Sequence, residues 1–134
     1  MRPQRYCLPV AKCEGHRLER RKAATSGEAK FFLGTDSAPH TVSAKEAACG
    51  CAGIFSAPSA LELYAQVFDD EDALDKFEAF ASLNGPAFYG LDVNEGTLTL
   101  KKQEGRVPGD VPVEGGEAVK PFHAGRTLAW TLVD

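Results

Sequence analysis

The sequence lacks any apolar run that approaches the ~20 residues needed to cross a bilayer. Its opening stretch, MRPQRYCLPV, lacks the apolar core of a signal peptide. It also lacks an excess of positive charge: the formal net charge is −4, so no strong field favours nucleic acid or an anionic membrane. We therefore expect a cytoplasmic protein whose partners include neither nucleic acid nor a membrane.

Residues that commonly bind metal ions are few. Histidine occurs three times, at His16, His40 and His123. Cysteine occurs four times, at Cys7, Cys13, Cys49 and Cys51. Cysteines of a cytosolic protein are expected to stay reduced, and neither short spacing here is the Cys-x2-Cys of common zinc sites. Two interpretations stay open: ordinary reduced thiols, or a thiolate zinc site that combines all four.

The composition is that of a globular protein. With 134 residues, of which 43% are hydrophobic and 25% charged, the chain can bury a core. Basic side chains crowd one short segment, at Arg17, Arg20, Arg21 and Lys22. This cluster is either the solvated face of a helix or a site for a polyanion.

The first part of the chain predicts a strand, a helix and a second strand. Residues 5–10 are typical of a short strand, and residues 14–25 of a weakly amphipathic helix. Residues 31–33, Phe-Phe-Leu, are typical of a buried strand. A strand, helix and strand over ~30 residues form a βαβ unit, which implies parallel strands and a right-handed crossover.

The middle of the chain predicts a long loop followed by helices. The loop, residues 37–58, consists mostly of small residues, and loops of this length are usually functional or mobile. A Ser-x-x-Glu capping box starts a helix at Ser59. A second helix is predicted over 71–82, with its aromatic residues in the core. We expect the sequence Asn-Gly-Pro at 84–86 to break that helix and to begin one more turn, which ends near Gly90.

From Leu91 onward the sequence is richer in glycine and proline. Residues 97–100 and 126–133 alternate as strands do. Two parallel strands make neither a closed barrel nor a doubly wound sheet. The whole pattern is therefore typical of the end of a larger domain.

Residues 30–40, KFFLGTDSAPH, carry the candidate chemistry. The predicted strand places a carboxylate, Asp36, at its C-terminal end and an imidazole, His40, four residues later. In α/β enzymes, catalytic groups lie at the carboxyl ends of strands. The alternative is that Asp36 only caps an ordinary turn.

A resemblance to a known family rests on several motifs together. Residues 32–40, FLGTDSAPH, and 49–53, CGCAG, closely resemble the dihydroorotases of the monofunctional bacterial type, in the amidohydrolase superfamily. The Arg-Pro at 2–3 and the YCLP at 6–9 resemble the segment around barrel strand seven of that family. The FEAF at 77–80 and the NGP-x-FYG at 84–90 resemble the helices after strand eight.

The resemblance implies an α/β fold, the C-terminal part of a TIM-type (β/α)8 metal-dependent hydrolase barrel. Residues 1–90 would hold the last two strands with the following loop and helices. Residues 91–134 would form a small β-rich tail that packs on the barrel.

The resemblance also implies roles for four residues. Asp36 matches the strand-eight aspartate that binds the more buried metal ion and shuttles the proton. His40 matches the histidine that holds the substrate carboxylate. Ala52 matches a residue that contacts the substrate through its main chain, and Leu8 matches one whose backbone touches the pyrimidine ring.

The family interconverts N-carbamoyl-L-aspartate and L-dihydroorotate in pyrimidine biosynthesis, with two zinc ions that activate a hydroxide. Its His-x-His pair, its carboxylated lysine and two further histidines have no counterpart in this chain, nor do its substrate-binding Arg and Asn. A TIM barrel needs about 250 residues, so we expect a truncated form that is inactive alone. Expected partners are a second copy, in a homodimer, or a complementing N-terminal fragment. The alternative is a non-catalytic remnant that binds a partner chain.

Overall fold

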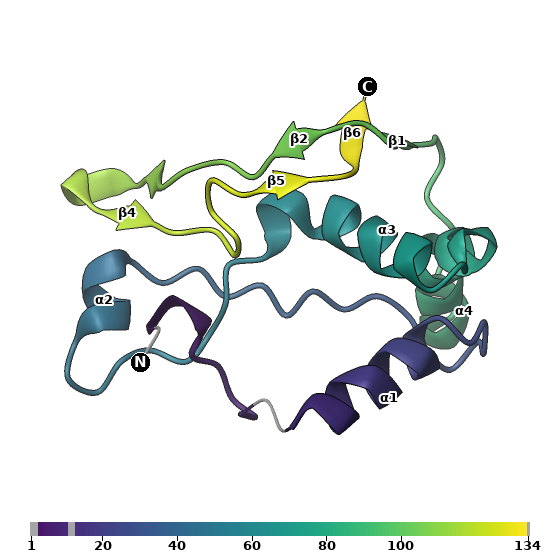
Figure 1. Cartoon of the computed structure of the whole chain (residues 1–134), viewed down its shortest axis with the longest axis horizontal. Helices are drawn as coiled ribbons and strands as arrows, with labels where there is room; N and C mark the ends of the chain where they lie inside the picture. The colour runs from purple at the N-terminus through teal and green to yellow at the C-terminus, as the bar shows by residue number, and fades with distance from the viewer. Residues whose placement is uncertain (1–2, 11–12, 134) are drawn as a thin grey trace. The chain divides into compact units, whose positions relative to one another are not determined.

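The computed structural model describes residues 3–10 and 13–133 of the chain (Figure 1). None of the helices it describes combines the length and the apolar character needed to cross a membrane. The chain divides into two compact units, each built from three stretches. Unit 1 comprises Met1–Ala11, Thr35–Ala60 and Gly105–Leu128. Unit 2 comprises Lys12–Gly34, Leu61–Glu104 and Ala129–Asp134.

Two of the predicted helices are confirmed. Helix α1 spans Glu14–Ala24, and at its end the Thr25 hydroxyl donates to the Arg21 carbonyl at 2.9 Å. Helix α3 spans Ala60–Asp70, directly after the 3₁₀ turn η2, Ala57–Ser59. Its start lies within one residue of the predicted one, which is the usual uncertainty of a helix end.

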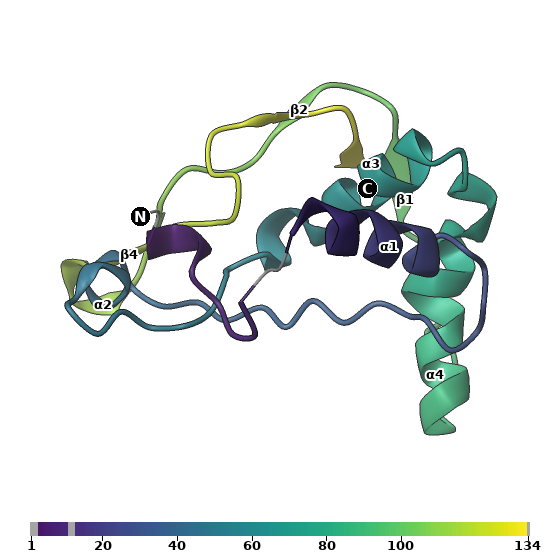
Figure 2. The same cartoon turned by 60° about the horizontal axis from the view of Figure 1, so that its bottom comes forward.

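The predicted break at Pro86 is wrong. Residues 74–89 are helical throughout, from the 3₁₀ turn η3, Leu74–Lys76, to α4, Asn84–Tyr89 (Figure 2). Proline lacks an N–H and its ring collides with the carbonyl four residues earlier in a regular α-helix. Here the turns before it, η4 at Ala79–Leu83, are π-helical, and such wider turns accommodate the change in hydrogen bonding. The helix does end as expected, at Gly90, with a left-handed φ of 66°.

Unit 2 has an aromatic core, as the helical spacing predicts. Phe68 is fully buried, and Ala73 and Phe80 are nearly so. The Phe68 ring lies 5.1 Å from the Phe80 ring and 5.2 Å from the Phe77 ring, centroid to centroid. Partly buried residues complete the cluster: Ala24, Phe31, Leu33, Tyr64 and Phe77.

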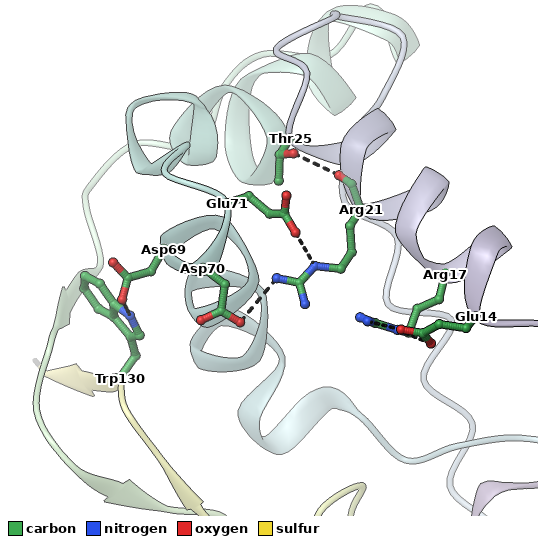
Figure 3. A network of polar contacts seen from close by, with 8 residues as sticks. All are labelled: Glu14, Arg17, Arg21, Thr25, Asp69, Asp70, Glu71 and Trp130. Carbon is green, nitrogen blue, oxygen red and sulfur yellow. Dashed lines mark hydrogen bonds and ion pairs between the residues drawn. The ribbon is translucent and has the colours of Figure 1, made fainter.

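Three of the four clustered basic side chains of α1 are paired with acids, and Figure 3 shows two of them, Arg17 and Arg21. Arg21 contacts Glu71 through Nε at 2.7 Å and Asp70 through Nη2 at 3.2 Å. Arg17 donates to Glu14 at 2.8 Å, a bond that lowers the pKa of that glutamate. Lys22 pairs with Glu19 at 2.8 Å. This arrangement supports the solvated helix face among the two interpretations of the basic segment.

The two predicted strands at 5–10 and 31–33 are wrong. Pro3–Arg5 form the 3₁₀ turn η1, and residues 6–10 and 31–33 belong to no ladder in the described part of the chain. A strand forms only when a neighbouring strand satisfies its main-chain N–H and C=O groups. The Leu33 amide donates instead to the Phe80 carbonyl, at 2.9 Å. The expected βαβ unit is therefore not present among the described residues.

The predicted loop at 37–58 is not wholly irregular, because it contains the short helix α2, Val42–Glu46. The Thr41 hydroxyl caps this helix by accepting from the Ala44 amide at 3.3 Å. Thr41 also forms an isolated antiparallel bridge with Val119 of the tail. Both contacts fix the segment that follows His40.

The tail forms short antiparallel pairs. In unit 2, β1 (Thr99–Lys101) pairs with β6 (Thr131–Val133). In unit 1, β2 (Gly105–Arg106) pairs with β5 (Thr127–Leu128), and β3 (Val111–Pro112) pairs with β4 (Ala118–Val119), across the turn η5 (Glu114–Gly116). The strand predicted at 97–100 is confirmed in β1, and the one predicted at 126–133 is present as β5 and β6. The buried residues of unit 1 include Val107, Val119 and Leu128 from this region.

Candidate functional site

Asp36 has an unusual backbone conformation. Its φ is +43°, in the left-handed region that non-glycine residues rarely adopt, and the residue is exposed. Backbone strain of this kind persists only where the surrounding structure imposes it, and it is frequent at functional sites. The contacts that impose this conformation are made by the residues on either side of Asp36.

Side chains and main chain of residues 54–57 hold both neighbours of Asp36. The Ser56 hydroxyl donates to the Thr35 carbonyl at 3.2 Å. The Ser37 hydroxyl accepts from the amides of Ser56 at 3.2 Å and Ala57 at 3.1 Å. Ser37 also forms a parallel bridge with Ile54. A second segment about twenty residues later therefore holds the residues on both sides of Asp36.

His40 and Ala52 are in direct contact within unit 1. The Nε2 atom of His40 lies 3.1 Å from the Ala52 carbonyl oxygen, and the imidazole is half-buried. Because a carbonyl oxygen only accepts, Nε2 carries the hydrogen in this contact. The structure thus brings together two of the four residues that the sequence singled out.

Gly53 is a site residue that sequence reasoning missed. Its φ is +148°, and a Cβ built there would lie 2.6 Å from the Ala38 Cβ and 3.0 Å from two atoms of the His40 ring. Only glycine lets the chain pass this close to the imidazole. The available signal was the glycine that follows Ala52 in CGCAG.

Leu8 belongs to the same unit, and Tyr6, two residues before it, contacts the segment of Ala52. The Gly53 amide donates to the Tyr6 carbonyl at 2.9 Å, so the segment that carries Leu8 runs beside the one that carries Ala52. Leu8 itself is 60% exposed, which leaves its side chain and backbone accessible.

The described residues do not form a metal site by themselves. No group of three or more His, Cys, Asp or Glu side chains among residues 3–10 and 13–133 is arranged to hold a metal ion. The four cysteines are free thiols, so the interpretation of a four-cysteine zinc site is wrong for this part of the chain. A zinc site needs three or four protein ligands, and no such set is assembled among these residues.

His123, the histidine of the tail in unit 1, is part of a turn. It has a φ of 62° and its ring lies 4.1 Å from the Phe122 ring, edge to face. Burial lowers its pKa, and Arg126 and Arg5 act in the same direction.

Comparison with known proteins gives a consistent answer. Residues 4–103 match the model of the amidohydrolase family. The chain is 66% identical, over 132 residues, to a dihydroorotase of Erythrobacter litoralis, covering 98% of this chain and 38% of the relative. It is 62% identical, over 133 residues, to a dihydroorotase of Sphingopyxis alaskensis, covering 99% of this chain and 38% of the relative.

Solved structures agree. The chain superposes on a Saccharomyces cerevisiae dihydroorotase in complex with 5-fluoroorotic acid, with a TM-score of 0.90 and 35% identity over 98% of this chain and 38% of that one. It superposes on a Campylobacter jejuni dihydroorotase with a TM-score of 0.84 and 33% identity, over 100% of this chain and 39% of that one. The chain therefore spans less than two-fifths of the proteins that it matches.

Proposed function

The chain belongs to the amidohydrolase family, and we propose that it supplies the C-terminal part of a dihydroorotase. The proposed enzyme interconverts N-carbamoyl-L-aspartate and L-dihydroorotate in the cytoplasm. In the complete TIM-type barrel, the segments at 5–10 and 31–33 would gain neighbouring strands and become strands seven and eight. Residues 91–134 would be the tail that packs on that barrel.

One observation carries the proposal: residues 35–57 form a single hydrogen-bonded frame that holds Asp36, His40 and Ala52. Its two sides are joined by the Ser37 contacts to residues 56 and 57 and by the contact between His40 and Ala52. A rigid frame of this kind is what a catalytic site requires of its scaffold. All residues of the frame belong to unit 1.

The chemistry follows from the groups that the frame presents. Asp36, exposed and acceptor-only when ionised, is suited to take a proton from an attacking water and return it to the leaving amide nitrogen. The Nε2–H group of His40 donates to the Ala52 carbonyl, so the other ring nitrogen, Nδ1, is the atom left for a ligand. When that nitrogen is protonated it donates to a carboxylate, a group that both substrates carry.

Zinc enters this proposal only through the complete protein. Of the ligands that a zinc ion needs, the described residues supply the Asp36 carboxylate. The remaining ligands have to come from outside these residues, so we expect the 134-residue chain alone to be inactive.

The test is reconstitution. The chain is combined with a segment that supplies the rest of a dihydroorotase barrel, taken from the Erythrobacter litoralis relative, and hydrolysis of L-dihydroorotate is measured with zinc present. We expect activity only from the combination, and a rate lower by about 10²–10⁴ when Asp36 is replaced by Asn. A folded combination without activity would contradict the proposed function, and full activity from the chain alone would contradict the need for a partner segment.

A second candidate function is the binding of a partner chain without catalysis. Unit 2 exposes an aromatic group in which Phe88 is 68% and Tyr89 is 66% exposed. Both rings pack against Phe32, at 5.2 Å and 5.8 Å between centroids. Exposed aromatic rings that lie together favour association with another chain. Co-purification of the two segments without turnover would favour this candidate.

A further inference from the structure

Lys45 is a buried lysine in a part of the chain dominated by small residues. It lies in α2 and is only 5% exposed. Burial of an ammonium group is costly unless hydrogen-bond partners replace the lost water. The burial of Lys45 therefore requires hydrogen-bond acceptors around its Nζ atom.

Three main-chain carbonyls surround that atom. Nζ donates to Tyr6 at 2.8 Å, to Cys51 at 2.7 Å and to Gly53 at 2.6 Å. An ammonium group has three hydrogens, so its donors are fully used. Burial lowers the pKa of Lys45, while the Cys51 and Cys7 thiols act in the opposite direction. Hydrogen bonds from a charged donor are about twice as strong as neutral ones.

The three carbonyls border two residues of the candidate site. Cys51 and Gly53 stand on either side of Ala52, and Tyr6 precedes Leu8 by two positions. The same carbonyl of Tyr6 also accepts from the Gly53 amide. One ammonium group therefore joins the segment of Leu8 to the segment of Ala52 at a point where no ladder joins them.

We propose that Lys45 is a positioning residue for the substrate-binding backbone. By fixing residues 51–53 against residue 6, it holds the Ala52 carbonyl where the His40 imidazole donates to it. All three N–H groups of Lys45 donate to main-chain carbonyls, so Lys45 acts through Ala52, Leu8 and His40 rather than on a substrate. The consequence for substrate binding rests on the proposed function; the consequence for the backbone does not.

The backbone consequence is tested on the 134-residue chain by hydrogen–deuterium exchange of single amides. The amides of Cys51 and Gly53, bonded to the Ala44 and Tyr6 carbonyls, report on the clamped segment. The Val107 amide, bonded to Arg126 in the same unit, is the internal reference. In Lys45→Met we expect exchange at the two reporter amides to accelerate by at least about tenfold, with Val107 unchanged.

The matched control is Lys101→Met, which removes an exposed lysine and should leave all three rates as in the parent chain. Unchanged rates at Cys51 and Gly53 in Lys45→Met would overturn the proposal. Equal acceleration at Val107 would also overturn it, because Lys45 would then support general stability and not the position of one segment.

The functional consequence is tested in the reconstituted enzyme. We expect Lys45→Met to raise KM for L-dihydroorotate about tenfold while kcat stays within about twofold. The displaced backbone would bind the substrate and the transition state equally less well, and such a uniform loss of binding changes KM but not kcat. A loss confined to kcat would overturn the positioning role. If the reconstituted parent enzyme has no activity, the proposed function fails while the exchange experiment still decides the role of Lys45.

Discussion

The imidazole of His40 donates from Nε2 to the carbonyl oxygen of Ala52, at 3.1 Å. This contact joins residues twelve positions apart, on either side of α2, and fixes both the orientation of the ring and its tautomer. It leaves Nδ1 as the nitrogen that a ligand can reach. The role of His40 in the candidate site follows from this contact.

Replacement of His40 by Ala should weaken substrate binding more than turnover. In the reconstituted enzyme we expect KM for L-dihydroorotate to rise by about 10- to 100-fold, because a hydrogen bond to a charged group contributes about 1.5–3 kcal/mol. His16→Ala, in the exposed part of α1, is the control. A His40→Ala enzyme with the parent KM and kcat would refute the role given to this histidine.

Replacement of Asp36 by Asn should act on kcat. The amide has nearly the same shape as the carboxylate but does not accept a proton, and loss of general acid–base catalysis costs about 10²–10⁴ in rate. The left-handed φ at residue 36 should survive, because Asn also tolerates this conformation. Equal circular dichroism spectra of the two proteins would check this, and a parental kcat in Asp36→Asn would rule out the assigned chemistry.

Gly53→Ala should destabilise unit 1. The added methyl group would meet Ala38 at 2.6 Å and the His40 ring at 3.0 Å, so one of them has to move. Overpacking of this size costs about 1–3 kcal/mol, measurable as a lower urea midpoint. Gly109→Ala is the matched control, because a Cβ there meets no atom within 4 Å, and its midpoint should be that of the parent. Equal midpoints for the two variants would contradict the close approach.

The helices could be predicted because their signals are local. Charged residues and alanines over 14–24, and aromatic residues at helical spacing near 68–80, act within a few turns of the same segment. The strands predicted at 5–10 and 31–33 are wrong because a parallel strand forms only with neighbours that lie far away in the sequence, which a local pattern does not contain. Strand partners for these two segments are not among the described residues.

The candidate site was only partly predictable for a related reason. Asp36 and His40 carry recognisable chemistry and lie in a recognisable motif. The contacts of Lys45 with Tyr6, Cys51 and Gly53 join segments up to 39 residues apart, and nothing in the local pattern encodes them. A lone lysine in a small-residue loop looks like an exposed side chain until its burial is known.

Phe68→Ala should be the most damaging single change in unit 2. The side chain is fully buried between Phe77 and Phe80, and truncation of a buried phenylalanine costs about 3–5 kcal/mol. Phe88→Ala removes the same atoms from a residue that is 68% exposed, and should cost no more than about 1 kcal/mol in this chain. Urea unfolding of both variants compares the two costs, and similar losses would contradict the location of the core.

Trp130 provides a spectroscopic probe of how the tail is held in unit 2. It is the single tryptophan of the chain, and its indole Nε1 donates to the Asp69 carboxylate at 3.2 Å (Figure 3). Lys102, whose Nζ lies 2.6 Å from the same oxygen, lowers the pKa of Asp69, and the Trp130 bond adds to this effect.

A carboxyl group whose pKa is lowered in the folded protein contributes stability above its ordinary pKa and loses it as pH falls through the lowered value. Trp130 fluorescence should therefore stay constant from neutral pH down to about pH 4, the ordinary range of aspartate, and change only below it. Asp69→Asn should abolish this acid transition, because the amide has no proton to gain over that range. A transition near neutral pH, or one that persists unchanged in Asp69→Asn, would show that another group controls the environment of the indole.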